Sequence, residues 1–213
     1  MSTKKIHYVS GTIMAVFISL HLFNHLASIS SAGDHIRIMD MLRVVYRSRV
    51  GETILLAACG VQIVSGIRLL VNKRKQLTDA FDRLQLWTGF YLAFFLIVHL
   101  SAVMAGRYLW HVDTNLYFGA SGLNSYPAKL FFIPYYGSAV LAVFGHIAAV
   151  HFRKMKRTVL GVSVRRQAVL ILLAGVVTTV VIFYGLTNGF TRLEAPTTHI
   201  PAGKQASTLL IGR

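Results

Sequence analysis

Five long apolar stretches constrain what this chain can fold into more than any other feature of its sequence. A helix needs about 20 predominantly apolar residues to cross the hydrocarbon core of a bilayer. Stretches of that length lie at about residues 8–30, 50–71, 84–109, 128–152 and 167–186. Only 14% of the residues are charged, whereas roughly a quarter are charged in a typical soluble domain. The sequence therefore predicts an all-α integral membrane bundle of five transmembrane helices.

The first apolar stretch is predicted to be a membrane span and not a cleavable signal peptide. Its apolar part is too long for a signal peptide, and polar residues interrupt it, among them His21 and His25. The five spans are expected to form one domain of residues 1–190. Residues 191–213 are expected to form an extended tail.

The strong positive charge of the chain is best explained by membrane topology. The chain has 22 Lys and Arg against 7 Asp and Glu, a formal charge of +15, which alone would suggest nucleic-acid binding. The basic residues instead flank the apolar stretches, so no nucleic-acid partner is expected. Thirteen lie on the side of the N-terminus and nine on the other side. This excess favours a cytoplasmic N-terminus and an external C-terminus. The outer connections are then about residues 31–49 and 110–127, the second an ordered loop at the interface.

Histidines inside the predicted spans are the candidate metal ligands. Cys59 is the only cysteine, which excludes a disulfide framework and a CxxC metal site. His21 lies about 20 Å and His99 about 23 Å from the inner ends of their helices, at about 1.5 Å per residue. Two neutral imidazoles at one height are the usual ligands of a heme held between helices. We therefore predict that His21 and His99 ligate a heme in the outer half of the membrane. The alternative is that each histidine makes a hydrogen bond to a neighbouring helix.

The inner half of the bundle presents a less complete set of ligands. His146 is about 27 Å from the outer end of its helix, which places it in the inner half. The second span has Gln62 at the corresponding height, and Gly66 lies one turn further on the same face. Glutamine is a poor iron ligand, although the glycine would leave room for a flat macrocycle. One heme is therefore expected, and a second that uses His146 remains open.

The remaining histidines have weaker claims to a function. His25 lies one turn beyond His21 and could replace it as a ligand, bind a heme propionate or make a polar contact near the interface. His151 is about 140° around the helix from His146, so the two cannot bind one iron. The others are expected to be interfacial or exposed, with no role assigned; they are His7, His35, His111 and His199.

Short motifs stand at three places in the predicted spans. The first span has IHYVSG followed by LHL. The third, RLQLWTGFYLAFFLIVHL, has a Gln-x-x-Thr-Gly run with a histidine ten residues after the glycine, at Gln85, Thr88, Gly89 and His99. The fourth has FGHIAAVHF, which contains His146. In these motifs, and over nearly all five spans, the chain resembles one family, the five-helix cytochrome b membrane subunits of succinate dehydrogenases and fumarate reductases, in which histidines matching His99 and His146 are heme ligands.

The resemblance implies a cofactor, a substrate and partners. Family members bind heme b, exchange electrons with quinone, and anchor an iron–sulfur and a flavoprotein subunit on the inner face of the bacterial cytoplasmic membrane. It implies His21 and His99 as the outer pair, and the second span with His146 as the inner pair. Glu52, Gln62 and Gly66 match the second-span pattern, with Gln62 in place of the histidine.

Glu52 is the carboxylate expected to act on quinone or in a proton path, because quinone chemistry needs a proton carrier within reach. It is the only carboxylate at an outer span end near the predicted heme. The alternative is a structural pairing with Arg47 or Arg49 at a helix N-terminus, where the helix dipole also favours a carboxylate.

Three other functions remain open on the sequence alone. The chain could be a heme-free anchor whose histidines are structural, or a stand-alone transmembrane cytochrome b without dehydrogenase partners. A transporter is the weakest alternative, because the sequence shows no inverted repeat or pair of broken helices. The basic inner connections could dock an acidic iron–sulfur subunit or contact anionic lipid headgroups.

Overall fold

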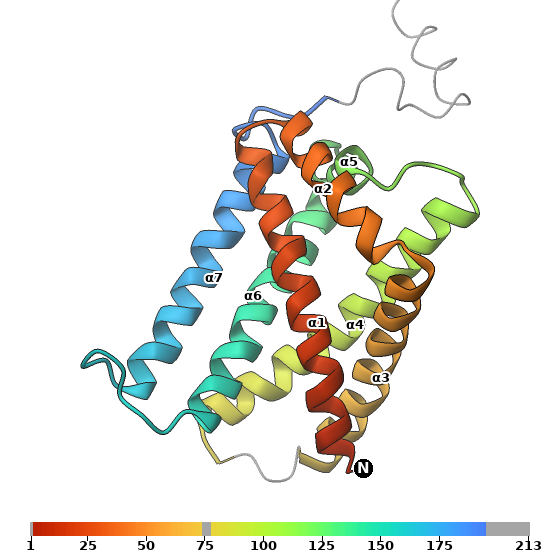
Figure 1. Cartoon of the computed structure of the whole chain (residues 1–213). Helices are drawn as coiled ribbons and strands as arrows, with labels where there is room; N and C mark the ends of the chain where they lie inside the picture. Colours follow the sequence, from red (N-terminus) through yellow and green to blue (C-terminus); the bar gives the residue numbers. More distant parts are fainter. Residues whose placement is uncertain (1, 74–77, 195–213) are drawn as a thin grey trace, which may run out of the picture.

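The computed structural model describes residues 2–73 and 78–194, and this part of the chain contains α-helices, one short 3-10 helix and no β-strand (Figure 1). Five of the helices are long and apolar enough to cross a membrane. The elements are α1 (Thr3–Leu26), η1 (Ala27–Ile29), α2 (Ala32–Tyr46), α3 (Arg49–Lys73), α4 (Ala80–Tyr108), α5 (Leu116–Asn124), α6 (Lys129–Lys154) and α7 (Val164–Leu186). The prediction of an all-helical, multi-pass membrane protein is confirmed.

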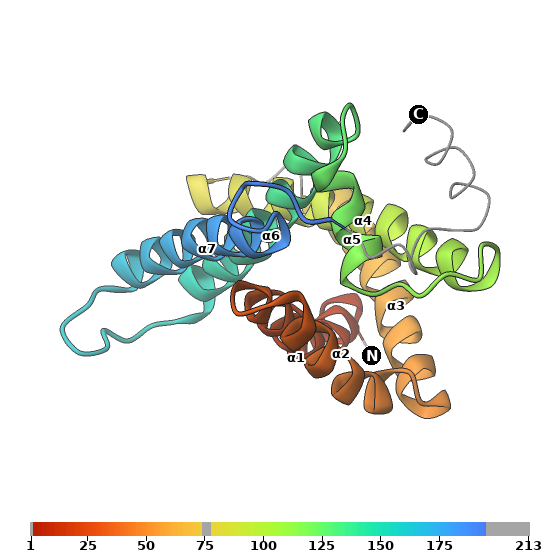
Figure 2. The same cartoon turned by 90° about the horizontal axis from the view of Figure 1, so that it is seen from above.

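The five long helices pack in sequence as neighbours. Helix α3 lies between α1 and α4, α6 lies between α4 and α7, and α7 returns to contact α1 and η1 (Figures 1 and 2). Helices α2 and α5 lie together at the end of the bundle where α7 finishes, which we call the upper end (Figure 1). The start of α1, the end of α3, the start of α4 and the α6–α7 connection lie at the opposite, lower end (Figure 1).

Helices α2 and α5 occupy the two connections between spans at the upper end, so the expectation of a loop at residues 110–127 is wrong in part. Each helix begins at a capping side chain: Ser31 Oγ accepts from the backbone N–H of Asp34 at 2.9 Å, and Asn115 Oδ1 accepts from that of Tyr117 at 3.0 Å. Such caps satisfy backbone donors that a helix N-terminus leaves unpaired. Helix α5 then buries Leu116, Ala120 and Leu123 in a cluster with Ile182 and Leu186 of α7.

Small residues allow α7 to approach its neighbours closely. A Cβ atom on Gly175 would lie 2.6 Å from Cβ of Phe144 in α6. A Cβ atom on Gly185 would lie 2.2 Å from Oγ of Ser28 and 2.9 Å from the backbone nitrogen of Ile29 in η1. Glycines at such positions are typical of membrane helix contacts, where close backbone approach replaces the hydrophobic driving force.

The outer surface of the bundle is apolar, with tryptophans near both ends of α4. Trp87 is 65% exposed near the lower end, and Trp110 is 63% exposed just beyond the upper end. Tryptophan is enriched at the two membrane–water interfaces, because its ring is both apolar and polar. The tail predicted at residues 191–213 begins after α7, and all of it beyond residue 194 lies outside the described residues.

Candidate functional site

His21 of α1 and His99 of α4 face each other in the upper half of the bundle. Their ring centroids are 6.3 Å apart, with an angle of 65° between the ring planes. Metal–imidazole bonds of about 2.0–2.1 Å place the centres of two imidazoles that share one metal ion roughly 6 Å apart. The separation of the two rings therefore fits a bis-histidine heme, and both imidazoles are half-buried.

Aromatic rings lie against both histidines. Phe17 stacks on His21 with centroids 5.6 Å apart, and Phe95 stacks on His99 with centroids 5.0 Å apart. The ring of Tyr136 in α6 meets His99 edge-on at 6.5 Å. Flat aromatic groups thus lie against both imidazoles, an arrangement that suits a macrocycle.

His21 belongs to a larger group that we call the upper histidine cluster, made of His21, His25, His35 and His99. Nε2 of His21 lies 3.2 Å from Nε2 of His25, and Nδ1 of His25 lies 3.3 Å from Nε2 of His35. Of the three alternatives for His25, the structure therefore places it in a polar contact. Ligation of iron by His21 requires its Nε2 to turn from His25 toward His99.

His35 is buried, so the expectation that it is interfacial or exposed is wrong. It lies on α2 with 2% of its surface exposed, and its Nε2 is 3.2 Å from Nδ2 of Asn24 in α1. Burial, reinforced by the positive charge of Arg43, lowers the pKa of His35 from 6.5 to about 4. The ring is therefore neutral at pH 7.

The buried neutral state of His35 predicts a loss of stability in mild acid. In the unfolded chain the ring takes up a proton near pH 6.5, whereas in the fold it does so only near pH 4. Stability is thus fully present above pH 6.5 and falls as the pH drops toward 4, by roughly 2 kcal/mol at pH 5. We expect His35→Gln to flatten the decline in thermal stability between pH 7.5 and 5 in detergent.

The control for this prediction is His111→Asn, because His111 is exposed and asparagine tolerates its positive φ of 49°. The groups that face His35 are Asn24 and His25 from α1 and Arg43 from α2. If His35→Gln and wild type lost stability equally between these pH values, the assignment of a depressed pKa to His35 would be wrong.

The lower half of the bundle presents Gln62 to α1. Its Nε2 donates to the backbone carbonyl of His7 at 2.6 Å and to Oγ of Ser10 at 2.9 Å. A Cβ atom on Gly11 would lie 2.9 Å from that nitrogen, so the glycine makes room for the amide. Gln62 therefore acts as a polar link between α1 and α3.

His146 contacts α4. Its Nδ1 lies 3.2 Å from Oγ1 of Thr88, and a Cβ atom on Gly89 would lie 3.3 Å from its Cε1. Gly66 faces His7, whose Cε1 is 3.5 Å from the position of a Cβ atom at residue 66. The residues predicted for an inner heme thus serve two different helix pairs, α1–α3 and α4–α6. They do not provide the two imidazoles of a bis-histidine site.

Glu52 forms an ion pair with Arg107 of α4, to which both of its carboxylate oxygens bind. The structural alternative expected Arg47 or Arg49 as the partner of Glu52, and that pairing is wrong, because the ion pair is with Arg107. Arg107 also donates to the hydroxyl of Tyr108 at 3.2 Å. The pair joins the upper ends of α3 and α4.

Several polar residues at the lower end of the bundle make contacts within the protein. His151 Nε2 lies 2.8 Å from Oε1 of Gln167, and His7 Nδ1 lies 2.8 Å from Oγ of Ser65. Arg153 pairs with the buried carboxylate of Asp82. This basic residue therefore holds the lower ends of α4 and α6 together. His199, Arg74 and Lys75 lie outside the described residues.

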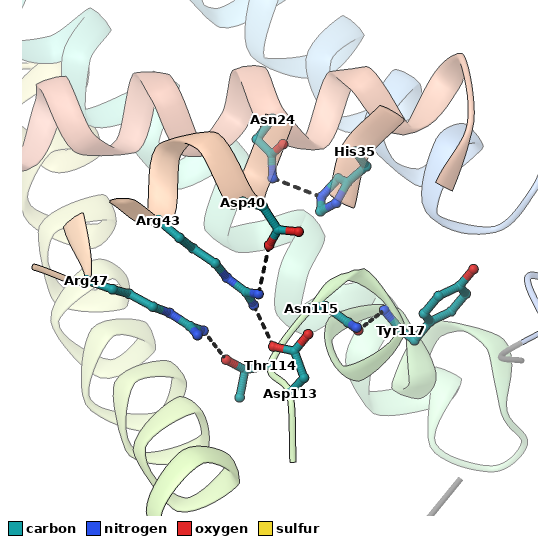
Figure 3. A network of polar contacts seen from close by, with 9 residues as sticks. All are labelled: Asn24, His35, Asp40, Arg43, Arg47, Asp113, Thr114, Asn115 and Tyr117. Atoms are coloured by element: carbon teal, nitrogen blue, oxygen red, sulfur yellow. Dashed lines mark hydrogen bonds and ion pairs between the residues drawn. The ribbon is translucent and has the colours of Figure 1, made fainter. Parts of the chain in front are cut away.

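A network of polar side chains at the upper end was not expected from the sequence (Figure 3). Arg43 of α2 pairs with Asp40 at 3.1 Å and with Asp113 at 2.9 Å, and Arg47 donates to Oγ1 of Thr114 at 2.8 Å. The sequence places the two cations one helical turn apart and Asp40 close to Arg43, but Asp113 and Thr114 lie 70 and 67 residues away from their partners. That separation left no local signal for the network.

Comparisons of the chain with protein-family models, with curated proteins and with solved structures give no significant match.

Proposed function

We propose that the chain is a membrane cytochrome b that binds one heme b between His21 and His99 and exchanges electrons with quinone. The observation that supports this most directly is the approach of the two imidazoles, whose ring centroids are 6.3 Å apart across α1 and α4. The half-buried, aromatic surroundings support it as well. The engagement of Gln62 with α1 argues against a second heme.

A bound heme would supply one-electron redox chemistry. The protein's own residues would supply two neutral imidazoles as ligands and keep water from the ring faces with Phe17 and Phe95. They also control the electrostatic environment of the site. Glu52 remains the candidate for a quinone or proton-path role, with Arg107 as its ion-pair partner.

The resemblance in sequence motifs supports a finer proposal. The chain would be the membrane subunit of a succinate:quinone or quinol:fumarate oxidoreductase in the cytoplasmic membrane of a bacterium. The lower end, which carries the more basic connections, would face the cytoplasm and bind the iron–sulfur and flavoprotein subunits. The N-terminus would then be inside.

A visible spectrum of the purified protein tests the heme proposal. We expect a Soret band and a reduced α band, and a pyridine hemochrome assay that gives about one heme per chain. The absence of both bands would favour the heme-free anchor instead. Two hemes per chain would contradict the assignment of Gln62 as a link to α1.

Purification in a mild detergent separates the finer proposal from a stand-alone cytochrome b. The expected result is that mass spectrometry finds an iron–sulfur protein and a flavoprotein in the same gel-filtration peak as this chain. A heme-containing chain that purifies alone under these conditions, from its native membrane, would favour the stand-alone cytochrome.

A further inference from the structure

Arg43 of α2 and Arg47, the residue that caps the C-terminus of this helix, point toward the connection between α4 and α5 (Figure 3). We call Arg43 and Arg47 the arginine pair. They are one helical turn apart, a spacing that places side chains on the same face. Only 12% of the Arg43 side chain is exposed, and Arg47 is half-buried.

The carboxylates near the arginine pair are bound to Arg43 and not to Arg47. Asp40 and Asp113 both bind Arg43, and Glu52 binds Arg107. Within the described residues, the contact of Arg47 is with the hydroxyl of Thr114, and no carboxylate lies within ion-pair distance of it. Burial, together with the nearby charges of Arg43 and Arg107, lowers the pKa of Arg47 more than the charge of the nearby Asp113 raises it. A cation is thus held where an anion would stabilise it.

Three buried polar atoms of the same network are without a hydrogen-bond partner in the part of the chain that the structure describes. They are Nε of Arg43, Oδ1 of Asn24 and Nδ1 of His35. Leaving a buried polar atom unpaired costs roughly 1–3 kcal/mol. A group of such atoms at one place therefore indicates a bound polar ligand or ordered water.

The arginine pair lies beside the upper histidine cluster. Tyr46, next to Arg47 in the sequence, meets the ring of Phe17 edge-on at 5.5 Å, and Phe17 stacks on His21. On the other side, the hydrogen-bond chain from His35 through His25 also reaches His21. An anionic group attached to a ligand of His21 and His99 would thus find Arg47, whose contact is with the hydroxyl of Thr114, and Arg43 beside it.

We propose that the arginine pair binds the carboxylates of the heme held by His21 and His99. This inference rests on the proposed function. Arginine suits the role because its guanidinium forms charge-assisted, often bidentate, hydrogen bonds with carboxylates. The bound carboxylates neutralise Arg47, and water or a carboxylate oxygen satisfies Nε of Arg43.

The test compares the heme-loaded protein with the double variant Arg43→Gln/Arg47→Gln. The matched control is Arg37→Gln, on the same helix, because Arg37 is exposed and pairs only locally with Asp34. Two properties are measured: the midpoint potential of the heme and its rate of transfer to apomyoglobin. We expect the double variant to have a lower midpoint potential, because the lost positive charge stabilised the more negative reduced state. Loss of charged hydrogen bonds should speed heme release roughly 10-fold or more.

A charge-conserving variant keeps the test independent of folding. Arg43→Lys/Arg47→Lys should retain a potential near that of wild type, and gel filtration and thermal unfolding should show that both double variants are folded. If the glutamine variant matched Arg37→Gln in potential and in release rate, the inference would be overturned while the proposed heme remained. The inference would also be overturned if the glutamine variant lost co-purified anionic phospholipid without any change in potential or release rate, since the pair would then bind lipid phosphate. A wild-type protein without heme bands would overturn both.

Discussion

Replacing His99 with alanine is expected to abolish heme binding, with loss of the Soret and α bands from the purified protein. His99 is the only histidine of the upper histidine cluster on α4, and His21, His25 and His35 all come from α1 and α2. Its loss therefore removes one side of the iron. His21→Ala should have a smaller effect, because His25 lies 3.2 Å away and offers a second imidazole from the same helix. The pyridine hemochrome assay measures heme per chain in each variant.

His146→Ala is the matched control for His99→Ala. It removes an imidazole of the same kind, but one that contacts Thr88 and Gly89 away from the upper histidine cluster. We expect this variant to keep most of its heme. Loss of heme in His146→Ala together with full retention in His99→Ala would place the cofactor in the lower half and refute the ligand assignment.

Replacing Gly185 with alanine should be among the most destabilising single changes in the bundle. The new methyl group would lie 2.2 Å from Oγ of Ser28 and 2.9 Å from backbone atoms of η1. The hydroxyl of Ser28 cannot easily turn away, because it donates to the carbonyl of His25 at 2.6 Å. Overpacking of this kind costs about 2–3 kcal/mol. The apparent Tm in detergent should fall by roughly 5–10 °C.

Gly60→Ala in α3 provides the comparison, because a Cβ atom there would meet nothing within 4 Å. Alanine has the higher helix propensity and restricts the unfolded chain, so this variant should be neutral or slightly more stable. Equal Tm values for the two alanine variants would show that α7 and η1 can separate without cost, contrary to the packing described.

The five spans and the meeting of His21 with His99 could be predicted because both follow from regular helix geometry. Apolar length defines a span, and a constant rise per residue sets the height of each histidine in it. Helix α2 was harder to predict from the sequence, although Ser31 followed by Asp34 three residues later is a capping signal. The burial of His35 depends on how α2 packs against α1. The sequence near His35 contains no pattern that predicts this packing.

The partners of polar side chains were the least predictable part of the site. Glu52 pairs with Arg107, 55 residues away along the chain, although Arg47 and Arg49 are only a few residues from it in the sequence. Gln62 was expected, from the resemblance in motifs, to stand where a heme ligand would be, yet its amide binds α1, 55 residues earlier. Such contacts depend on which helices become neighbours and on the room left by a residue such as Gly11.

Trp87 and Trp110 are the only two tryptophans of the chain, and both are largely exposed near the two ends of α4. At about 1.5 Å per residue, the part of α4 from Trp87 to its end at Tyr108 is roughly 32 Å long, close to the thickness of a bilayer's apolar core. Intrinsic fluorescence of the unmodified protein therefore samples both leaflets at once. Removing either indole leaves a single reporter whose depth shows where the membrane begins on that side.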